Sequence, residues 1–259
     1  MKATRWLLFS IFILYFFLLG PFVIIFVASF GADATMAFPP SGFSLEWFAR
    51  IFEQEQFINS FWTSLRLGLI STGVSLIFGI PVAYGLVRFQ FRGEDAIETI
   101  FSAPILVPGL VVGFAMLNFF VLFGRINVFQ GLLIGHTAIL FPYSVRVTSV
   151  SLRNLDPNIE EAAVSLGANR LRAFVLVVLP NMRAGIAAAF ILGFITSFNN
   201  VPVSLFLSGP GITTLPVSML SYMEYYFDPT IAALSTILVV FSIILVQLAE
   251  RLLGLSRFV

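Results

Sequence analysis

Few residues in this chain could do chemistry. The 259-residue sequence contains a single lysine, Lys2, a single histidine, His136, and no cysteine. A P-loop needs a lysine after a glycine-rich turn to hold nucleotide phosphates, so this chain cannot bind ATP in that way. Hydrolytic triads and zinc sites with two or more histidines lack their usual parts, and thiolate sites are excluded. The composition therefore argues against an enzyme and directs attention to two polar stretches.

The first polar stretch covers residues 156–180 and predicts two short helices that meet at a tight elbow. Asp156 suits a helix N-cap, and Pro157 suits the first helical position. Gly167 suits the position just beyond the end of that helix, and Asn169 can cap a second one. Such an elbow could dock into a cleft on another protein. The alternative is an ordinary loop with a capped helix.

The elements around this stretch are predicted to be membrane spans. Hydrophobic residues make up 59% of the chain and charged residues 10%, and the mean hydropathy is +1.00. Soluble domains carry about 25% charged residues, so we predict an all-α integral membrane protein that forms a single transmembrane domain over residues 1–259. Apolar runs of spanning length predict six transmembrane helices, approximately at residues 6–28, 59–87, 96–123, 128–150, 184–207 and 229–253, with a loop at 151–183.

The second polar stretch interrupts the fifth predicted span. Polar side chains and a proline inside an apolar helix are costly against lipid, so we expect them to line a solute pathway. The alternative is a hydrogen-bonded clamp between helices. The third predicted span carries prolines that break its hydrogen bonding, and the alternative there is a structural kink. The candidate pathway residues are Pro104, Pro108, Asn118, Thr196, Ser197, Phe198, Asn199, Asn200 and Pro202.

Three further features have weaker signals. His136 lies within the fourth predicted span, where a hydrogen-bonded packing role is favoured over a proton relay. Arg66 lies near the outer end of the second span, where reaching the interface is favoured over pairing inside. Residues 31–58 contain Trp47 and Phe48 among charged residues, which fits an interfacial helix or a plain surface loop.

The basic residues predict the orientation of the chain. With six spans, both ends lie on one side, together with most of the arginines and the lysine. The opposite side holds Arg50 and Arg125, with Arg66 near it. By the positive-inside rule, both termini and the 151–183 loop are expected in the cytoplasm.

The 156–180 stretch also resembles a known motif. Glu161-Ala162-Ala163 is followed at fixed spacing by Gly167, Val177 and Leu179-Pro180. This pattern resembles the EAA loop of binding-protein-dependent ABC importer permeases, in which isoleucine usually stands where Val177 does. The resemblance implies a type I ABC importer permease (MetI-like) fold, in which this loop is the coupling helix seated on a cytoplasmic ATPase. The coupling residues it implies are Glu160, Glu161, Ala162, Ala163, Gly167, Ala168, Arg170, Leu179 and Pro180.

Within that family, the spermidine/putrescine type is the most similar. Residues 87–93 and 207–210 and the Asp228-Pro229 pair resemble that subgroup. Polyamine permeases of this type tend to have an acidic pair where Asn199-Asn200 stand. Two amides do not attract a polycation as carboxylates do. The solute is therefore expected to be small and polar: a polyamine, if the partner permease supplies the acid, or an amino-acid derivative, an opine or an organophosphonate.

The resemblance also implies an assembly in the bacterial inner membrane. Its expected members are a second permease chain, preferably a different one rather than a second copy, two cytoplasmic ATPase subunits and a periplasmic solute-binding protein. ATP and Mg would bind to the ATPase subunits, and no cofactor, metal or nucleic acid is expected on this chain. One rival is a stand-alone secondary transporter or channel, which would work without an ATPase. Another is a membrane-embedded enzyme, which would need a nucleophile with a base or a metal cluster.

Overall fold

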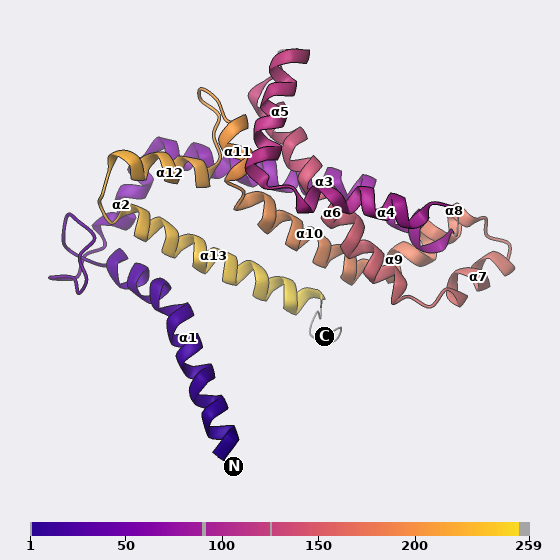
Figure 1. The fold of residues 1–259 in the computed structure, drawn as a ribbon, viewed down its shortest axis with the longest axis horizontal. Coiled ribbons are helices and arrows are strands. Elements are labelled where there is room, and N and C mark those ends of the chain that lie inside the picture. Colours follow the sequence, from indigo (N-terminus) through magenta and orange to yellow (C-terminus); the bar gives the residue numbers. More distant parts are fainter. Residues whose placement is uncertain (1, 90–91, 125, 254–259) are drawn as a thin grey trace. The chain divides into compact units, whose positions relative to one another are not determined.

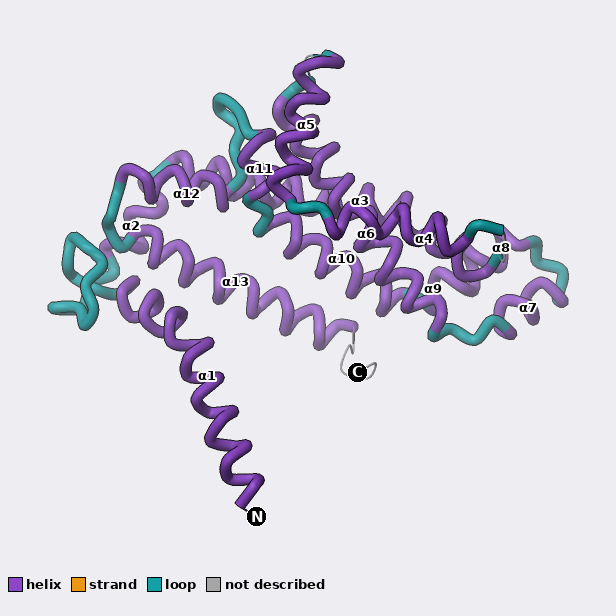
Figure 2. The backbone as a smooth tube through the Cα atoms, in the orientation of Figure 1, coloured by secondary structure: helices purple, strands orange, loops and turns teal. Residues whose placement is uncertain are grey.

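The computed structural model describes residues 2–89, 92–124 and 126–253, and this part of the chain is helical (Figures 1 and 2). Extended pairing in it is limited to two isolated β-bridges, Gly31 with Phe43 and Gly209 with Ile212. The all-α class predicted from the sequence is confirmed.

The chain divides into two compact units, which we describe separately. The first comprises Met1–Asn59 and Ser218–Ile244. It contains α1 (Lys2–Ser29), α2 (Glu46–Glu53), the start of α3 (Glu55–Arg88), the C-terminal part of α12 (Leu215–Tyr225) and most of α13 (Thr230–Leu253). The second comprises Ser60–Val217 and Leu245–Val259. Its further elements are α4 (Glu94–Ser102), η1 (Ala103–Leu106), α5 (Gly109–Phe123), α6 (Val128–Arg153), α7 (Asn158–Ser165), α8 (Arg170–Ala173), η2 (Phe174–Val178), α9 (Leu179–Asn181), α10 (Arg183–Phe198) and α11 (Pro202–Leu207).

Four helices in the described part are long and apolar enough to cross a membrane, namely α1, α3, α6 and α13. A fifth span is obtained if Arg170–Asn181 (α8 to α9) and Arg183–Phe198 (α10) are counted as one bent helix. The angle between these two segments is 70°. The predicted third span at 96–123 is divided into α4, η1 and α5. Pro108 is the N-cap of α5 with an extended ψ of 129°, because a proline cannot continue the hydrogen bonding of a preceding helix. The exact span boundaries and the single membrane domain stay predictions.

Helices α3 and α6 approach each other closely in the second unit. A Cβ added to Gly79 would lie 2.8 Å from Ser144 Cβ, so these backbones are nearly in contact. One turn earlier on α3, Ser75 Oγ lies 2.6 Å from Ser144 Oγ. Small residues and hydroxyl pairs of this kind are how membrane helices associate without a hydrophobic driving force.

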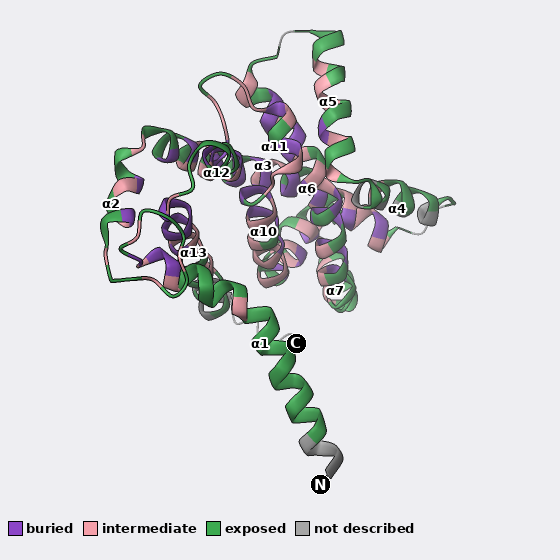
Figure 3. Cartoon of the chain, turned by 60° about the vertical axis from the view of Figure 1, so that its left-hand side comes forward, coloured by how far each residue is buried: buried purple, intermediate pink, exposed green. Residues whose placement is uncertain are grey.

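An apolar cluster lies at the other end of the same helices. Leu67 of α3, Leu132 of α6 and Val203 and Leu207 of α11 are buried together. Val112 and Met116 of α5, among others, pack against this cluster. Large apolar side chains also cover the outside of the molecule, as on α1, which is exposed along almost its whole length (Figure 3). That exterior is what a hydrocarbon environment requires.

Candidate functional site

The first helix of the elbow is α7, and its ends match the predicted signals closely. Asp156 Oδ1 accepts the backbone N–H of Asn158 at 2.9 Å. The helix begins at Asn158, so Pro157 occupies the N-cap, one residue outside its predicted place; boundaries of this kind vary by a residue. Gly167 has φ of +90°, the left-handed conformation that ends many helices. The predicted stop at Gly167 is confirmed.

The second helix of the elbow also begins as predicted. Asn169 Oδ1 accepts the backbone N–H of Arg172 at 2.8 Å and so caps α8. The chain then widens into a π-helical turn, η2, before α9. Pro180 lacks an N–H and its ring clashes with a regular helical carbonyl four residues earlier, which accounts for a wider turn here. Short π-helical turns are frequent at functional sites.

The outer surface of α7 is uncovered. Leu166 is 90% exposed and Val164 42% exposed, and Glu161 and Ala162 are also exposed. Ile159 and Ala163 are half-buried instead. The apolar residues of this segment are therefore divided between a side that faces this chain and a side that is free to contact another molecule. In Figure 2, loops flank α7 on both sides.

Glu160 is the residue whose role the sequence did not reveal. Tyr84 Oη of α3 donates a hydrogen bond to Glu160 Oε1. Arg88 Nε lies 3.4 Å from Glu160 Oε2, an ion pair between two largely buried side chains. The resemblance implied the same coupling role for Glu160 and Glu161, and both lie in the first turn of α7. A signal was present in the spacing of Tyr84 and Arg88, which share one face of α3, but nothing in the sequence showed where α7 would lie.

Beside this ion pair is an open cavity of about 300 Å³. Its lining residues are Arg88, Pro157, Glu160, Glu161, Val164, Ser165 and Arg170. Three of the predicted coupling residues, Glu160, Glu161 and Arg170, are thus brought together around one hollow. Leu179 and Pro180 lie further along, in α9.

The second polar stretch forms the break between α10 and α11. Asn200 Oδ1 accepts the backbone N–H of Val203 at 3.0 Å and caps α11. Thr196 Oγ1 donates to the carbonyl oxygen of Leu192 in its own helix at 2.8 Å. Asn199 is exposed. Of the two asparagines, Asn199 is therefore the one whose amide is available to a solute, while Asn200 holds the backbone of the break.

Ser197 belongs to a buried hydrogen-bonded group centred on His136. His136 Nδ1 lies 2.7 Å from Ser197 Oγ, and His136 Nε2 lies 3.0 Å from Ser204 Oγ. Ser71 Oγ of α3 lies 3.2 Å from Ser197 Oγ. The histidine thus joins α6 to α10 and α11 on either side of the break. This is the hydrogen-bonded packing role that the sequence favoured for His136.

Helices α5 and α11 pack on each other. Phe114 of α5 and Phe206 of α11 meet edge to face, with ring centroids 5.8 Å apart. Asn118 Nδ2 donates to the carbonyl oxygen of Phe114 at 3.1 Å, so it is bonded within its own helix. Phe198 is buried and packs on Phe194, with centroids 5.6 Å apart. Pro104 lies in η1, and its side chain is outside the described part of the structure.

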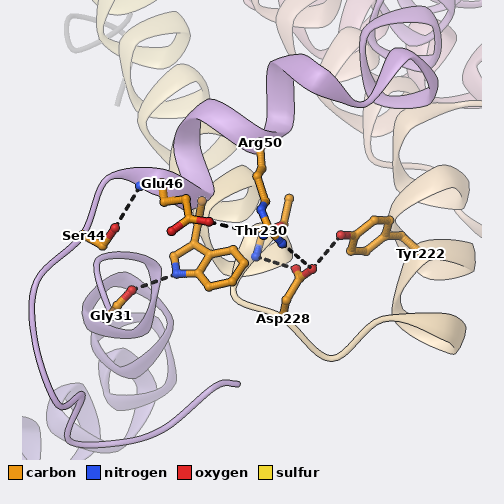
Figure 4. Close-up of polar contacts among 8 residues, drawn as sticks. Gly31, Ser44, Glu46, Arg50, Tyr222, Asp228 and Thr230 are labelled. Atoms are coloured by element: carbon orange, nitrogen blue, oxygen red, sulfur yellow. Dashed lines mark hydrogen bonds and ion pairs between the residues drawn. The ribbon is translucent and has the colours of Figure 1, made fainter. Parts of the chain in front are cut away.

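In the first unit, the stretch at 31–58 contains a genuine helix, α2, with Trp47 and Ile51 buried. Arg50 lies 3.2 Å from Glu46 and 3.9 Å from Asp228, measured between the charged atoms (Figure 4). Tyr222 Oη donates to Asp228 Oδ2 at 2.8 Å. Burial, reinforced by this hydrogen bond, raises the pKa of Tyr222. Helix α2 is thereby tied to the turn between α12 and α13, and its place at a membrane interface stays a prediction.

These features belong to a known class of membrane protein. The family described as "Binding-protein-dependent transport system inner membrane component" matches residues 75–256. The chain is a member of this family and is an ABC importer permease subunit. Permeases of this kind work with a second permease, an ATPase and a periplasmic binding protein. The predicted family and the predicted MetI-like fold are both confirmed.

Particular relatives are similar over most of the chain. The chain is 30% identical over 229 residues to the putrescine transport system permease protein PotI of Escherichia coli K12, covering 86% of this chain and 81% of the relative. It is 30% identical over 240 residues to the spermidine/putrescine transport system permease protein PotC of Haemophilus influenzae, covering 92% and 93%. The fold matches a chain of a bacterial ABC transporter involved in the import of the acidic polysaccharide alginate, with a TM-score of 0.73, 19% identity and coverage of 96% and 95%.

Proposed function

We propose that this chain, paired with a different permease chain, forms the translocation path of an ATP-driven importer for a small polar solute. The observation that carries the proposal is the elbow of α7 and α8. Its ends are capped by Asp156, Gly167 and Asn169, and Leu166 on its outer side is 90% exposed. A rigid, locally specified elbow with an uncovered apolar side suits insertion into a cleft on an ATPase.

In this mechanism, two cytoplasmic ATPase subunits bind ATP and Mg, and their closure moves the elbow. The spans then change between inward-open and outward-open arrangements. Such coupling requires that nucleotide bind with different affinity to the two arrangements. A periplasmic binding protein would deliver the solute to α2 and to the outer loop at 208–228. Both termini lie in the cytoplasm in this proposal, as the arginine distribution favours.

The solute class follows from the break between α10 and α11. Asn199 is exposed there and carries an amide rather than a carboxylate. An amide can hydrogen-bond a neutral, zwitterionic or anionic solute and gives no net attraction to a polycation. We therefore favour an amino-acid derivative, an opine or an organophosphonate. Putrescine is the second candidate, because the relatives PotI and PotC carry putrescine in their names.

The test is ATP-dependent uptake by the purified complex. The chain is co-expressed with candidate permease, ATPase and receptor subunits, purified and placed in liposomes. We expect the ATPase to co-purify. We also expect uptake to require ATP on the side of the liposome membrane where the ATPase subunits lie. Uptake by this chain alone without an ATPase would support the rival secondary transporter instead. A titration of the receptor with putrescine, octopine, aminoethylphosphonate and a set of amino acids then decides the solute class.

The orientation is tested separately. Because the chain has no cysteine, single cysteines at Ser165 in α7 and at Tyr226 after α12 can be reacted with an impermeant maleimide in spheroplasts. We expect the residue 226 site to react from outside and the residue 165 site to react only after the membrane is opened. The reverse pattern would overturn the proposed topology.

A further inference from the structure

The C-terminal end of α3 holds α7 at two points. Tyr84 and Arg88 lie one helical turn apart and share a face of α3. Both bind Glu160 in the first turn of α7, Tyr84 by a hydrogen bond to Oε1 and Arg88 by the 3.4 Å ion pair to Oε2. Arg88 Nη2 also donates to the carbonyl oxygen of Leu155 at 3.1 Å. One arginine therefore fixes both the segment that enters α7 and the helix itself.

The same end of α3 also contacts the second half of the elbow. The ring of Tyr84 packs on Phe174 of η2, with centroids 4.5 Å apart. Phe89, which follows α3, lies 5.8 Å from Tyr84 by centroid, and the guanidinium carbon of Arg170 in α8 lies 5.4 Å from the Phe89 ring centroid. Contacts from one helix end thus reach α7, α8 and η2.

Burial sets Glu160 apart from its neighbour Glu161. The side chains of Arg88 and Glu160 are only 12% and 10% exposed, whereas Glu161 is exposed. A carboxylate in the first turn of a helix stabilises the helix dipole whether or not its side chain is buried, so an exposed Glu160 would serve that purpose equally well. A buried ion pair is screened little by salt, and removal of either partner leaves an uncompensated charge. Burial of the Glu160 carboxylate costs desolvation free energy, which the Arg88 partner offsets only if α7 is held in one position. Capping alone would not require that burial.

We propose that Glu160 is a positioning residue that clamps α7 to α3 through Tyr84 and Arg88, so that the elbow and the end of α3 move as one body. This proposal rests on the proposed function, because the movement comes from an ATPase that pushes on α7. The two adjacent acids then have different tasks. Glu160 faces α3 and transmits the movement, while Glu161 remains free for the ATPase.

The experiment measures whether α7 and α3 keep a fixed distance. Cysteines replace Asn158 on α7 and Ile77 on α3, both exposed, and carry spin labels for pulsed EPR on the assembled transporter in nanodiscs. We expect a narrow distance distribution that does not shift when MgATP and vanadate are added. In Glu160→Gln and Arg88→Gln, the distribution should widen, and its mean should shift with nucleotide.

Matched variants separate the clamp from a general loss of structure. Tyr143→Phe and Arg146→Gln on α6 change the same residue types at exposed positions, and the wild-type distribution should persist in both. Tyr84→Phe removes only one hydroxyl group, so it should fold normally and give a smaller widening. In the double variant Arg88→Gln with Glu160→Gln, neither charge is left unpaired, so its widening should be less than the sum of the two single effects.

Two results would overturn the clamp. One is a wild-type distribution that itself shifts with nucleotide, since α7 would then move independently of α3. The other is a wild-type width in Glu160→Gln, Arg88→Gln and Tyr84→Phe alike. Failure of the proposed function has a different signature. In that case no ATPase assembles and nucleotide has no effect on any variant, while the widths measured without nucleotide still report on the clamp.

Discussion

Adjacent residues with similar side chains have different roles in the polar break between α10 and α11. Asn200 accepts the N–H of Val203 and caps α11, whereas the adjacent Asn199 is exposed. Ser197 bonds the buried His136, whereas the adjacent Thr196 bonds a carbonyl of its own helix. Two of these four side chains therefore maintain the shape of the break, and the exposed Asn199 is the one best placed to meet a solute.

The cap at Asn200 gives a prediction on stability. Asn200→Ala removes the acceptor for the Val203 N–H and should lower the free energy of unfolding by about 1 kcal/mol, as for other N-cap losses. Asn200→Ser retains a side-chain acceptor and should stay close to the wild type. Thermal unfolding in detergent micelles measures both, with Asn199→Ala as the neighbouring control. Equal stability of the Ala and Ser variants would contradict the capping role.

His136 gives a prediction that separates packing from proton transfer. His136→Phe loses the bonds to Ser197 and Ser204 and should cost about 1–3 kcal/mol of stability, as for buried polar groups left unpaired. His136→Gln can still donate and accept hydrogen bonds, so it should retain both stability and solute uptake. Uptake and thermal unfolding are measured in parallel. A stable Gln variant without uptake would indicate a proton relay instead.

At the scale of helices, packing of α3 on α6 depends on a missing side chain. A Cβ at Gly79 would lie 2.8 Å from Ser144 Cβ and 3.3 Å from the Ser144 carbonyl carbon, which is backbone and cannot move aside cheaply. Gly79→Ala should therefore destabilise by about 1–3 kcal/mol, the usual cost of overpacking. Gly73, on the same helix, has no atom within 4 Å of such a Cβ.

Gly73→Ala is therefore the matched control, and it should be neutral or slightly stabilising, because alanine favours helix. The midpoint of thermal unfolding, compared between the two alanine variants, is the measurement. If both variants unfold at the same temperature, the two helices are not in close contact at Gly79.

Sequence patterns predicted the elements that depend on local chemistry. Asp156, Gly167 and Asn169 act within a few residues of themselves, and their places at the ends of α7 and α8 were predictable for that reason. The roles of Glu160 and Ser197 depend on partners far away in the sequence, Tyr84 and His136, and a single sequence does not show which elements meet.

Broken helices were only partly predictable for a related reason. Prolines and amides marked the interruptions at 104–109 and 199–202, and the structure divides the chain at both. Helix α5 is a separate helix of 15 residues, which is shorter than the predicted third span. Hydropathy alone could not show this, because an apolar segment has the same composition whether its helix is continuous or broken. The π-helical turn at η2 likewise results from Pro180 in a particular tertiary setting.

At the scale of the whole transporter, the elbow is where nucleotide-driven movement would enter this chain. Gly167 ends the first helix of the elbow in a left-handed conformation. The position has φ of +90°, and nothing lies within 4 Å of a Cβ built there. Any effect of substitution must therefore come from the backbone rather than from lack of space. A β-branched residue is strained at such φ, by about 1–2 kcal/mol, whereas asparagine tolerates it.

Gly167→Val should accordingly lower the population of the native elbow by about 5- to 30-fold relative to competing conformations, the factor that such a free energy represents. Insertion and assembly should persist, since the strain is local, but solute transported per ATP hydrolysed should fall. Gly167→Asn should keep the wild-type ratio, which distinguishes backbone conformation from the mere loss of glycine. Uptake and ATP hydrolysis measured on the same proteoliposomes give the ratio directly. If the valine variant couples as well as the wild type, the elbow tolerates distortion, and the movement must reach the spans by contacts outside residues 156–180.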